Sequence, residues 1–207
     1  MPSEPSARLY LVTPATLALE SFVATLGALL DTRAVVCVRL ALETTSEETL
    51  TRAADTLRPV CHARDVPLVV SDHYRLVRPL GLDGVHLRDG ARQVRAARKA
   101  LGRDAIVGAY ARASRHDGMN AAELGADYVS FGPVAPSSLG DGTLADHELF
   151  AWWAEMIEVP VVAEGGFAPE IAQTLARQAD FIALGDELWR HPEGAGAALA
   201  DYARSLA

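Results

Sequence analysis

The amino-acid sequence predicts a single (β/α)8 barrel. Short apolar segments rich in Val, Leu, Ile and Tyr alternate eight times with stretches that have helical spacing of apolar residues. Strands that alternate with helices indicate parallel βαβ units, and eight such units close into a barrel. No linker or low-complexity tract interrupts the series, so we expect one domain over residues 1–207. A doubly wound open sheet is the alternative that this pattern leaves open.

Each expected strand is a run of β-branched, aromatic or aliphatic residues bounded by Gly, Pro or Asp. We expect strands at residues 8–13, 34–42, 67–71, 83–87, 105–109, 127–131, 160–163 and 181–184. The segments between them carry apolar residues three and four apart, which is typical of helices packed on a sheet. We expect helices at residues 17–30, 47–64, 74–80, 91–101, 117–124, 146–157, 169–177 and 194–206.

Aspartates open three of the strands in similar sequence contexts. Asp83, Asp127 and Asp180 each precede an apolar run. This recurrence supports repeated units, and we expect the three carboxylates to cap turns at the amino ends of the strands.

Period-two alternation in the second strand places Val35, Cys37 and Arg39 on one face. If Arg39 points into the barrel, the intervening residues face the helices. Arg39 then lies near the carboxyl end of its strand, where catalytic residues of barrels sit.

Composition limits the partners. The net charge is −8 and no basic block exists, so we expect neither nucleic acid nor a membrane as a partner. No run of about 18 apolar residues exists, and residues 1–5 lack the features of a signal peptide. Cys37 and Cys61 are expected to be buried thiols. These features predict a cytoplasmic protein, and one tryptophan of the pair at 152–153, with Trp189, is a candidate contact for a homodimer.

Polar residues collect at the carboxyl ends of the expected strands, where they would share one site. This set comprises Arg39, Ser71, Asp72, His73, His86, Arg88, Asp89, Tyr110, Arg112, Ser130, Ser137, Ser138, Glu164, Gly165, Gly166, Gly185 and Asp186. Carboxylates suit a divalent cation, arginines suit phosphate, and the amides of Gly165 and Gly166 suit an anion. A tight turn with positive φ is the alternative role for these two glycines, and a transition-metal site at His73, His86, Asp72 and Asp89 is a further alternative.

The loop after the sixth expected strand is long and polar. Gly132 and Pro133 end that strand, and Ser137 and Ser138 follow before Asp146 opens a helix. Loops of this length in compact domains are usually functional or disordered. We expect this loop to close one side of the site.

Five motifs in order resemble thiamine phosphate synthase and its sister, the thiazole tautomerase, over almost the whole chain. They lie at residues 9–13 (Leu-Tyr-Leu-Val-Thr), 71–72 (Ser-Asp), 83–87 (Asp-Gly-Val-His-Leu), 125–134 and 160–166 (Pro-Val-Val-Ala-Glu-Gly-Gly). The synthase joins hydroxymethylpyrimidine diphosphate to a thiazole phosphate with loss of diphosphate. The resemblance therefore implies a transferase of thiamine biosynthesis, with a small phosphorylated heterocycle as substrate and Mg²⁺ as cofactor.

The resemblance also assigns roles to residues. Asp72 and Asp89 match the magnesium aspartates, Arg39 the arginine that grips the diphosphate, and Ser137 a hydroxyl of the loop. Arg39, His86 and Ser137 are the catalytic candidates, although His86 could equally be a core histidine. The expected substrate contacts are Ser71, Tyr110, Arg112, Ser130, Ser138, Gly165, Gly166 and Gly185.

The sequence departs from the family within these motifs. Cys37 and Ala41 replace a glutamine and a lysine, Tyr110 replaces a serine, and Lys99 is the only lysine of the chain. Glu164 and Asp186 put carboxylates beside the expected phosphate site, where each would repel a phosphate. We hypothesise that Arg88, Arg112 and Arg115 rebuild a cationic patch. Three functions stay open: thiamine phosphate synthesis, action on another phosphorylated heterocycle, and ligand or partner binding without turnover.

Overall fold

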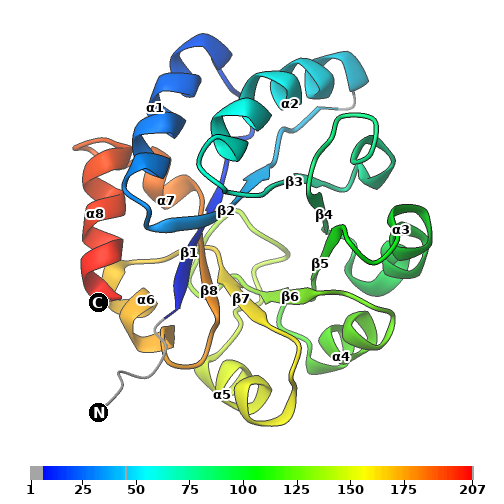
Figure 1. The fold of residues 1–207 in the computed structure, drawn as a ribbon. Helices are drawn as coiled ribbons and strands as arrows, with labels where there is room; N and C mark the ends of the chain where they lie inside the picture. Colours follow the sequence, from blue (N-terminus) through cyan, green and yellow to red (C-terminus); the bar gives the residue numbers. More distant parts are fainter. Residues whose placement is uncertain (1–6, 45, 207) are drawn as a thin grey trace.

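A computed structural model describes residues 7–44 and 46–206. Its parallel strands follow one another around a closed barrel in sequence order, and helices surround them (Figure 1). The strands are β1 Arg8–Val12, β2 Val35–Leu40, β3 Leu68–Ser71, β4 Gly84–Leu87, β5 Ile106–Tyr110, β6 Tyr128–Phe131, β7 Val161–Glu164 and β8 Phe181–Leu184. The helices are α1 Leu19–Asp31, α2 Glu47–His62, α3 Val94–Leu101, α4 Arg115–Glu123, α5 His147–Met156, α6 Pro169–Leu175, α7 Asp186–Trp189 and α8 Ala195–Ser205, with short 3-10 helices η1 Tyr74–Leu76 and η2 Gly90–Gln93.

The predicted (β/α)8 barrel is confirmed, and the open sheet is excluded because β1 pairs with β8. Two segments differ from expectation. The helix expected at residues 74–80 is reduced to η1, and the helix expected at 91–101 is divided into η2 and α3. The short helix α7 after β8 was not predicted, because its four residues are too few for a periodic pattern.

The three recurring aspartates lie at the amino ends of the strands, as predicted. Asp83, Asp127 and Asp180 each accept a hydrogen bond from a backbone amide of the preceding strand, at 2.7, 2.7 and 2.8 Å. The backbone amide of each aspartate also donates to the carbonyl of that same strand residue, which is Leu68, Val107 or Val161. The aspartates therefore tie β3 to β4, β5 to β6 and β7 to β8.

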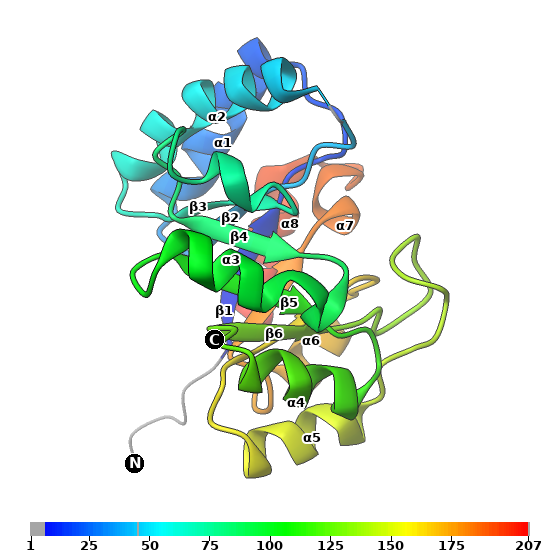
Figure 2. The ribbon, with the colours of Figure 1, turned by 90° about the vertical axis from the view of Figure 1, so that its right-hand side faces the viewer.

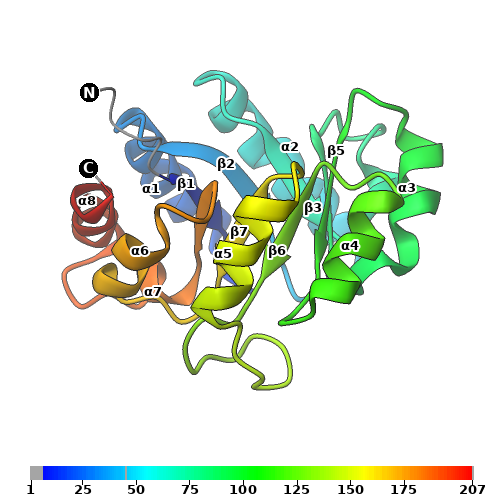
Figure 3. The ribbon, with the colours of Figure 1, turned by 90° about the horizontal axis from the view of Figure 1, so that it is seen from below.

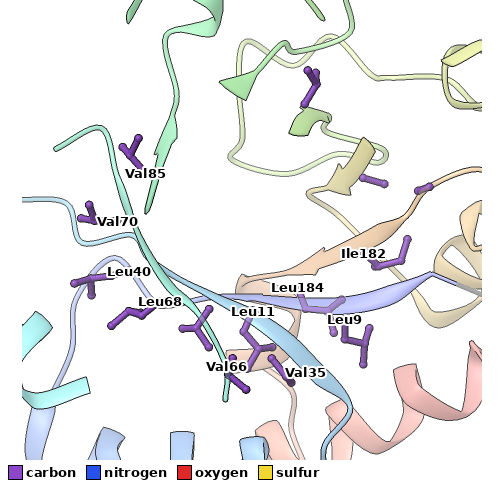
Figure 4. Packing of buried hydrophobic residues seen from close by; sticks show 14 of the residues in the cluster. Leu9, Leu11, Val35, Leu40, Val66, Leu68, Val70, Val85, Ile182 and Leu184 are labelled. Atoms are coloured by element: carbon purple, nitrogen blue, oxygen red, sulfur yellow. The ribbon is translucent and has the colours of Figure 1, made fainter. Parts of the chain in front are cut away.

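The strands separate two apolar clusters. The larger lies between strands and helices, and the smaller fills the barrel interior with Tyr10, Cys37, Val69, Tyr128, Val162 and Ala183. Cys37 and Arg39 face the interior as predicted. The prediction for Val35 is wrong, because Val35 packs in the outer cluster beside Leu11 (Figure 4). The register shifts between Leu9 and Tyr10, so that one extra residue of β2 fits there and reverses the facing of Val35.

The carboxyl ends of the strands share one end of the barrel with long loops. The loop at residues 132–145 extends furthest from the barrel in Figures 2 and 3, where it is yellow-green. Within the described part of the chain, no helix has the length and apolar character needed to cross a bilayer.

Candidate functional site

An ion pair crosses the barrel interior at the carboxyl ends. Nη1 of Arg39 on β2 lies 3.0 Å from Oε2 of Glu164 on β7, and both side chains are buried. The two strands are not neighbours in the barrel, so the pair spans the lumen. Burial alone would lower the pKa of Arg39, but the Glu164 carboxylate, together with Tyr10 and Tyr128, outweighs it and the pKa is raised. Arg39 is therefore a charged group whose charge the protein already compensates.

A hydrogen-bonded chain of aromatic residues lies deeper in the same lumen. Nδ1 of His86 is 2.9 Å from the hydroxyl of Tyr128, which is 2.9 Å from the hydroxyl of Tyr10. Burial lowers the pKa of His86 well below its ordinary value, and the charges of Arg39 and Arg88 lower it further. His86 is thus neutral at neutral pH, and the direction of the hydrogen bonds along the two hydroxyls decides whether its Nε2 donates or accepts.

Several polar atoms around this network are buried and have no hydrogen-bond partner among the described residues. They are Nε of Arg39, Oγ of Ser71, Nε2 of His86 and Oγ of Ser130. Each sits at or near the end of its strand, and Ser71 pairs in register with His86. Buried polar groups in proteins are normally hydrogen-bonded, so a concentration of unpartnered ones indicates a place for a ligand or ordered water.

The two predicted magnesium ligands follow β3 and β4. Oδ1 of Asp72 accepts from the backbone amide of Arg88 at 2.7 Å, and Oδ2 accepts from Nε of Arg88 at 2.6 Å. Oδ2 of Asp89 accepts from Gln93 at 2.9 Å, whereas Oδ1 is buried without a partner among the described residues. A magnesium ion is commonly held by one or two carboxylates together with phosphate and water, so these carboxylates have suitable chemistry, but Arg88 engages both oxygens of Asp72 and only Oδ1 of Asp89 is open.

The transition-metal alternative is wrong. Within residues 7–44 and 46–206, no three His, Cys, Asp or Glu side chains gather closely enough to hold a metal ion. His86 is committed to the barrel interior, while Asp72 binds Arg88 at the rim.

The loop at residues 132–145 packs on the turn after β7. Gly165 and Gly166 have φ of +84° and +83°, so the turn geometry needs glycine. The backbone amide of Val134 donates to the carbonyl of Gly165 at 2.9 Å. A Cβ at Gly166 would lie 2.4 Å from the carbonyl oxygen of Ala135, and one at Gly165 would lie 3.2 Å from Oγ of Ser137. Ser137 is therefore next to the glycine pair.

Tyr110 joins the same loop to the barrel. Its hydroxyl donates to the carbonyl of Gly132 at 2.6 Å, and a Cβ at Gly140 would lie 2.8 Å from that hydroxyl. Burial raises the pKa of Tyr110, and the negative charge of Glu164 raises it further. The residue that replaces the family serine thus fastens the base of the loop.

Carboxylates occupy the end of β8. The backbone amide of Gly185 donates to Oε1 of Glu187 at 3.1 Å. Asp186 pairs with Arg190 on the exposed side of α7, and Glu164 turns into the lumen toward Arg39. The two acids that would repel a phosphate are therefore both paired with arginines.

The predicted site residues lie at the same end of the barrel, but they differ in how deeply they are buried. Arg39, Ser71, His86, Tyr110 and Ser130 are buried, whereas Arg112, Ser137 and Ser138 are exposed on the rim. Of the hypothesised cationic patch, Arg88 binds Asp72 and Arg115 stacks over Trp152 at 4.8 Å. Only Arg112 of these three has no ion pair or ring contact among the described residues.

Two cavities lie apart from the ion pair. The larger, about 750 Å³, is at the amino ends of β1 and β2, with Arg8, Arg33, Arg64 and Asp31 on its walls. The smaller, about 200 Å³, lies beside η1 and includes Asp72, His73 and Gln93. The chemistry of the lumen, and not cavity size, therefore marks the candidate site.

Comparison with known proteins places this architecture in a family. The family model described as thiamine monophosphate synthase matches residues 9–188. A relative from Rhodospirillum centenum, named thiamine-phosphate synthase, is 44% identical over 201 residues, which are 96% of this chain and 97% of the relative. This chain belongs to the thiamine monophosphate synthase family.

A second relative agrees with this assignment, and a solved structure shares the fold. A thiamine-phosphate synthase from Erythrobacter litoralis is 41% identical over 148 residues, which are 70% of each chain. The structure of thiamine phosphate pyrophosphorylase from Pyrococcus furiosus superposes with a TM-score of 0.81 over 98% of this chain and 96% of that chain, at 22% identity. At this identity the superposition supports the shared barrel fold alone.

Sequence reasoning missed three partners within the site. Glu164 was seen as an obstacle to phosphate and not as the counter-ion of Arg39, while Tyr10 and Tyr128 were seen only as strand residues. Period-two alternation from Ser130 could have placed Tyr128 on the lumen side, in the same way that it placed Cys37 beside Arg39. The pairing across the barrel has no sequence signal, because Arg39 and Glu164 are 125 residues apart.

Proposed function

We propose that this protein joins hydroxymethylpyrimidine diphosphate to a thiazole phosphate, forming thiamine phosphate and releasing diphosphate. The observation that carries this proposal is the 44% identity to a thiamine-phosphate synthase over 96% of the chain. The convergence of unpartnered buried polar atoms at the carboxyl ends of the strands supports it, since active sites of barrels lie at that end.

In this reaction the bond between the pyrimidine methylene carbon and the diphosphate oxygen breaks, and the electron pair leaves with the diphosphate. The thiazole nitrogen then bonds to the methylene carbon. Because His86 is neutral and has one unpartnered ring nitrogen, its proposed role is a hydrogen bond to the substrate. Ser71 and Ser130 would contribute hydroxyls at the same end of the lumen.

Magnesium would be held at Asp72 and Asp89, next to the phosphate groups of the substrate. When bound, it would neutralise charge on the leaving diphosphate. The unpartnered Oδ1 of Asp89 is available to a cation, while Arg88 holds the carboxylate of Asp72 in place at the rim.

The rim would contact the phosphates. Ser137 and Ser138 lie on the exposed loop, and Gly165 and Gly166 form the turn beneath it. We propose that hydroxyls of the loop and amides of the turn meet the thiazole phosphate, with Arg112 nearby. The Gly185 amide would reach a phosphate only by releasing Glu187.

Binding without turnover is the second candidate function. It is favoured by one observation: carboxylates already engage Arg39, which the resemblance assigns to the diphosphate, and the amide of Gly185, which is an expected substrate contact. The third function, action on another phosphorylated heterocycle, has no separate structural observation in its favour.

The test is a turnover assay with both precursors and Mg²⁺, in which thiamine phosphate and diphosphate are measured by chromatography. We expect equal amounts of the two products from the wild-type protein. Asp72→Ala should remove turnover, whereas Asp31→Ala, which breaks a comparable aspartate–arginine pair at the other end of the barrel, should not. Absence of product from folded wild-type protein that binds both precursors would favour binding without turnover.

A further inference from the structure

The Arg39–Glu164 pair determines the charge of the lumen. The guanidinium carries one positive charge and the carboxylate one negative charge, and their atoms are 3.0 Å apart. Exposed fractions of 5% and 3% keep both groups out of bulk water. In such a place an unpaired charge is strongly unfavourable, and removing one partner leaves the other uncompensated.

A compensated guanidinium is a poor anchor for a second anion. A diphosphate next to Arg39 would also lie close to Glu164. At such short separations the Glu164 carboxylate would repel the charges of the diphosphate. The pair thus cancels much of the attraction that a lone arginine would give to the diphosphate.

The lumen offers hydrogen bonds in place of net charge. Beside the pair lie the unpartnered Nε of Arg39, the hydroxyls of Ser71 and Ser130, and Nε2 of His86. These atoms come from four strands and include both donors and acceptors. A neutral aminopyrimidine also presents donors and acceptors around its ring, so it complements this lining better than a diphosphate does.

The rim, in contrast, holds an arginine without an ion pair in the described part of the chain, although the pKa of Asp141 on the loop is lowered by hydrogen bonding with Thr143 and also by the positive charge of this arginine. Arg112 follows β5, is exposed, and has no ion pair within the described residues. Its positive φ of 54° and the hydrogen bond from the Gly132 amide to its carbonyl fix its backbone beside the loop.

We propose that Glu164 is a positioning residue that neutralises Arg39 and holds it for the uncharged ring of the substrate, leaving the diphosphate to Arg112 and the metal on the rim. This inference rests on the proposed function for the identity of the ring. It differs from the role implied by the family resemblance, in which Arg39 grips the diphosphate.

Titration calorimetry with two separate probes tests it. One probe is hydroxymethylpyrimidine, the uncharged alcohol, and the other is inorganic pyrophosphate with Mg²⁺. In Glu164→Gln, Arg39 becomes an uncompensated cation, so pyrophosphate affinity should rise about tenfold, which corresponds to about 1.4 kcal/mol. The affinity for the alcohol should fall, because Arg39 is no longer held. Asp31→Asn, which neutralises an exposed acid at the amino ends of the strands, should change neither.

A second variant keeps the inference testable if Glu164→Gln does not fold. Arg39→Gln combined with Glu164→Gln leaves no buried unpaired charge, so it is expected to fold even if the single variant does not. The double variant should lose most of its affinity for the alcohol and bind pyrophosphate with wild-type affinity. Arg112→Gln should show the reverse: weaker binding of pyrophosphate and wild-type affinity for the alcohol.

The opposite pattern overturns the inference. If the double variant loses pyrophosphate as strongly as the alcohol, Arg39 anchors the diphosphate. Unchanged pyrophosphate affinity in folded Glu164→Gln, or no binding of either probe to wild-type protein at millimolar concentration, also contradicts it. Neither probe requires turnover, so a failed assay with the two precursors would refute the proposed reaction and leave this binding pattern to be judged by itself.

Discussion

Polar side chains at the two ends of the barrel differ in whether they have hydrogen-bond partners. At the amino ends, Asp83, Asp127 and Asp180 accept amide hydrogen bonds that join neighbouring strands. At the carboxyl ends, Ser71 and Ser130 are buried with hydroxyls that have no partner within the described residues. The same barrel therefore satisfies these aspartates at one end and leaves the serine hydroxyls available at the other. One exception on the amino-end side is Oε1 of Gln178, shortly before β8, a buried atom that has no partner within the described residues.

This difference separates stability from binding. A hydrogen bond within the protein contributes to the free energy of unfolding, whereas a buried polar atom without a partner costs free energy until a ligand or water meets it. Substitutions at the amino ends should therefore affect stability with little effect on ligands. Substitutions at the carboxyl ends should affect ligands more than stability, except where a buried charge is involved.

The exception gives the largest expected effect. Arg39→Met leaves Glu164 buried without its partner, and we expect a loss of about 3–5 kcal/mol in the free energy of unfolding. Arg39→Met with Glu164→Gln should recover much of this loss, because no unpaired charge is then buried. Urea unfolding of both variants measures the difference. A double variant no more stable than the single one would show that packing, not charge, accounts for the loss.

At the amino end, Asp180→Ala removes the acceptor for the buried amide of Val161. Leaving that donor unsatisfied should cost about 1–3 kcal/mol. Asp180→Asn is the matched control, since its amide oxygen can still accept the bond, and it should lose much less. Thermal and urea unfolding give the values, and affinity for the pyrimidine alcohol should be unchanged in both. A change in that affinity would contradict the separation of the two ends.

Most of the fold could be predicted because its signals are local. Ser46 and Asp146 cap α2 and α5 by accepting hydrogen bonds from amides three residues on, and the helices expected from 47 and 146 begin at or beside these residues. Alternation placed Cys37 and Arg39 in the lumen. It failed for Val35, because the register shift in β2 depends on pairing with β1 and not on β2 alone.

The site could be predicted only as a set of strand ends. The order of the strands along the chain identified Asp72, His86 and Ser130 as residues at the carboxyl ends. It did not identify the side chains that they contact. The partner of Asp72 is Arg88, and that of His86 is Tyr128, 42 residues away. Such pairs depend on the diameter of the barrel and on the length of the side chains that meet across it. A local sequence pattern does not predict which side chains will meet.

His86 allows a test of the lumen through pH. Its pKa is lowered in the folded protein, so between that value and about 6.5 the unfolded chain binds more protons. The free energy of unfolding should therefore fall as pH drops below about 6.5, with a contribution of about 1.4 kcal/mol per pH unit from this histidine. His86→Gln should remove that part of the slope. Urea unfolding between pH 7 and 5 measures both slopes, and equal slopes would mean that His86 is accessible to protons in the folded state.

Ser130→Ala is expected to have the smallest effect on stability. It should also show the clearest difference between an effect on stability and an effect on ligand binding. Its hydroxyl is fully buried and has no partner in the described chain, so its removal relieves an unsatisfied group and should change the free energy of unfolding by less than about 0.5 kcal/mol. Ser114→Ala is the matched control, because the Ser114 hydroxyl caps α4 and its loss should cost about 1 kcal/mol. Ligand binding should reverse this order: Ser130→Ala should weaken the pyrimidine alcohol several-fold, and Ser114→Ala should not. Ser130→Ala could instead be the less stable variant and bind the alcohol with wild-type affinity. The Ser130 hydroxyl would then stabilise the fold, and the ligand would not bind in the lumen.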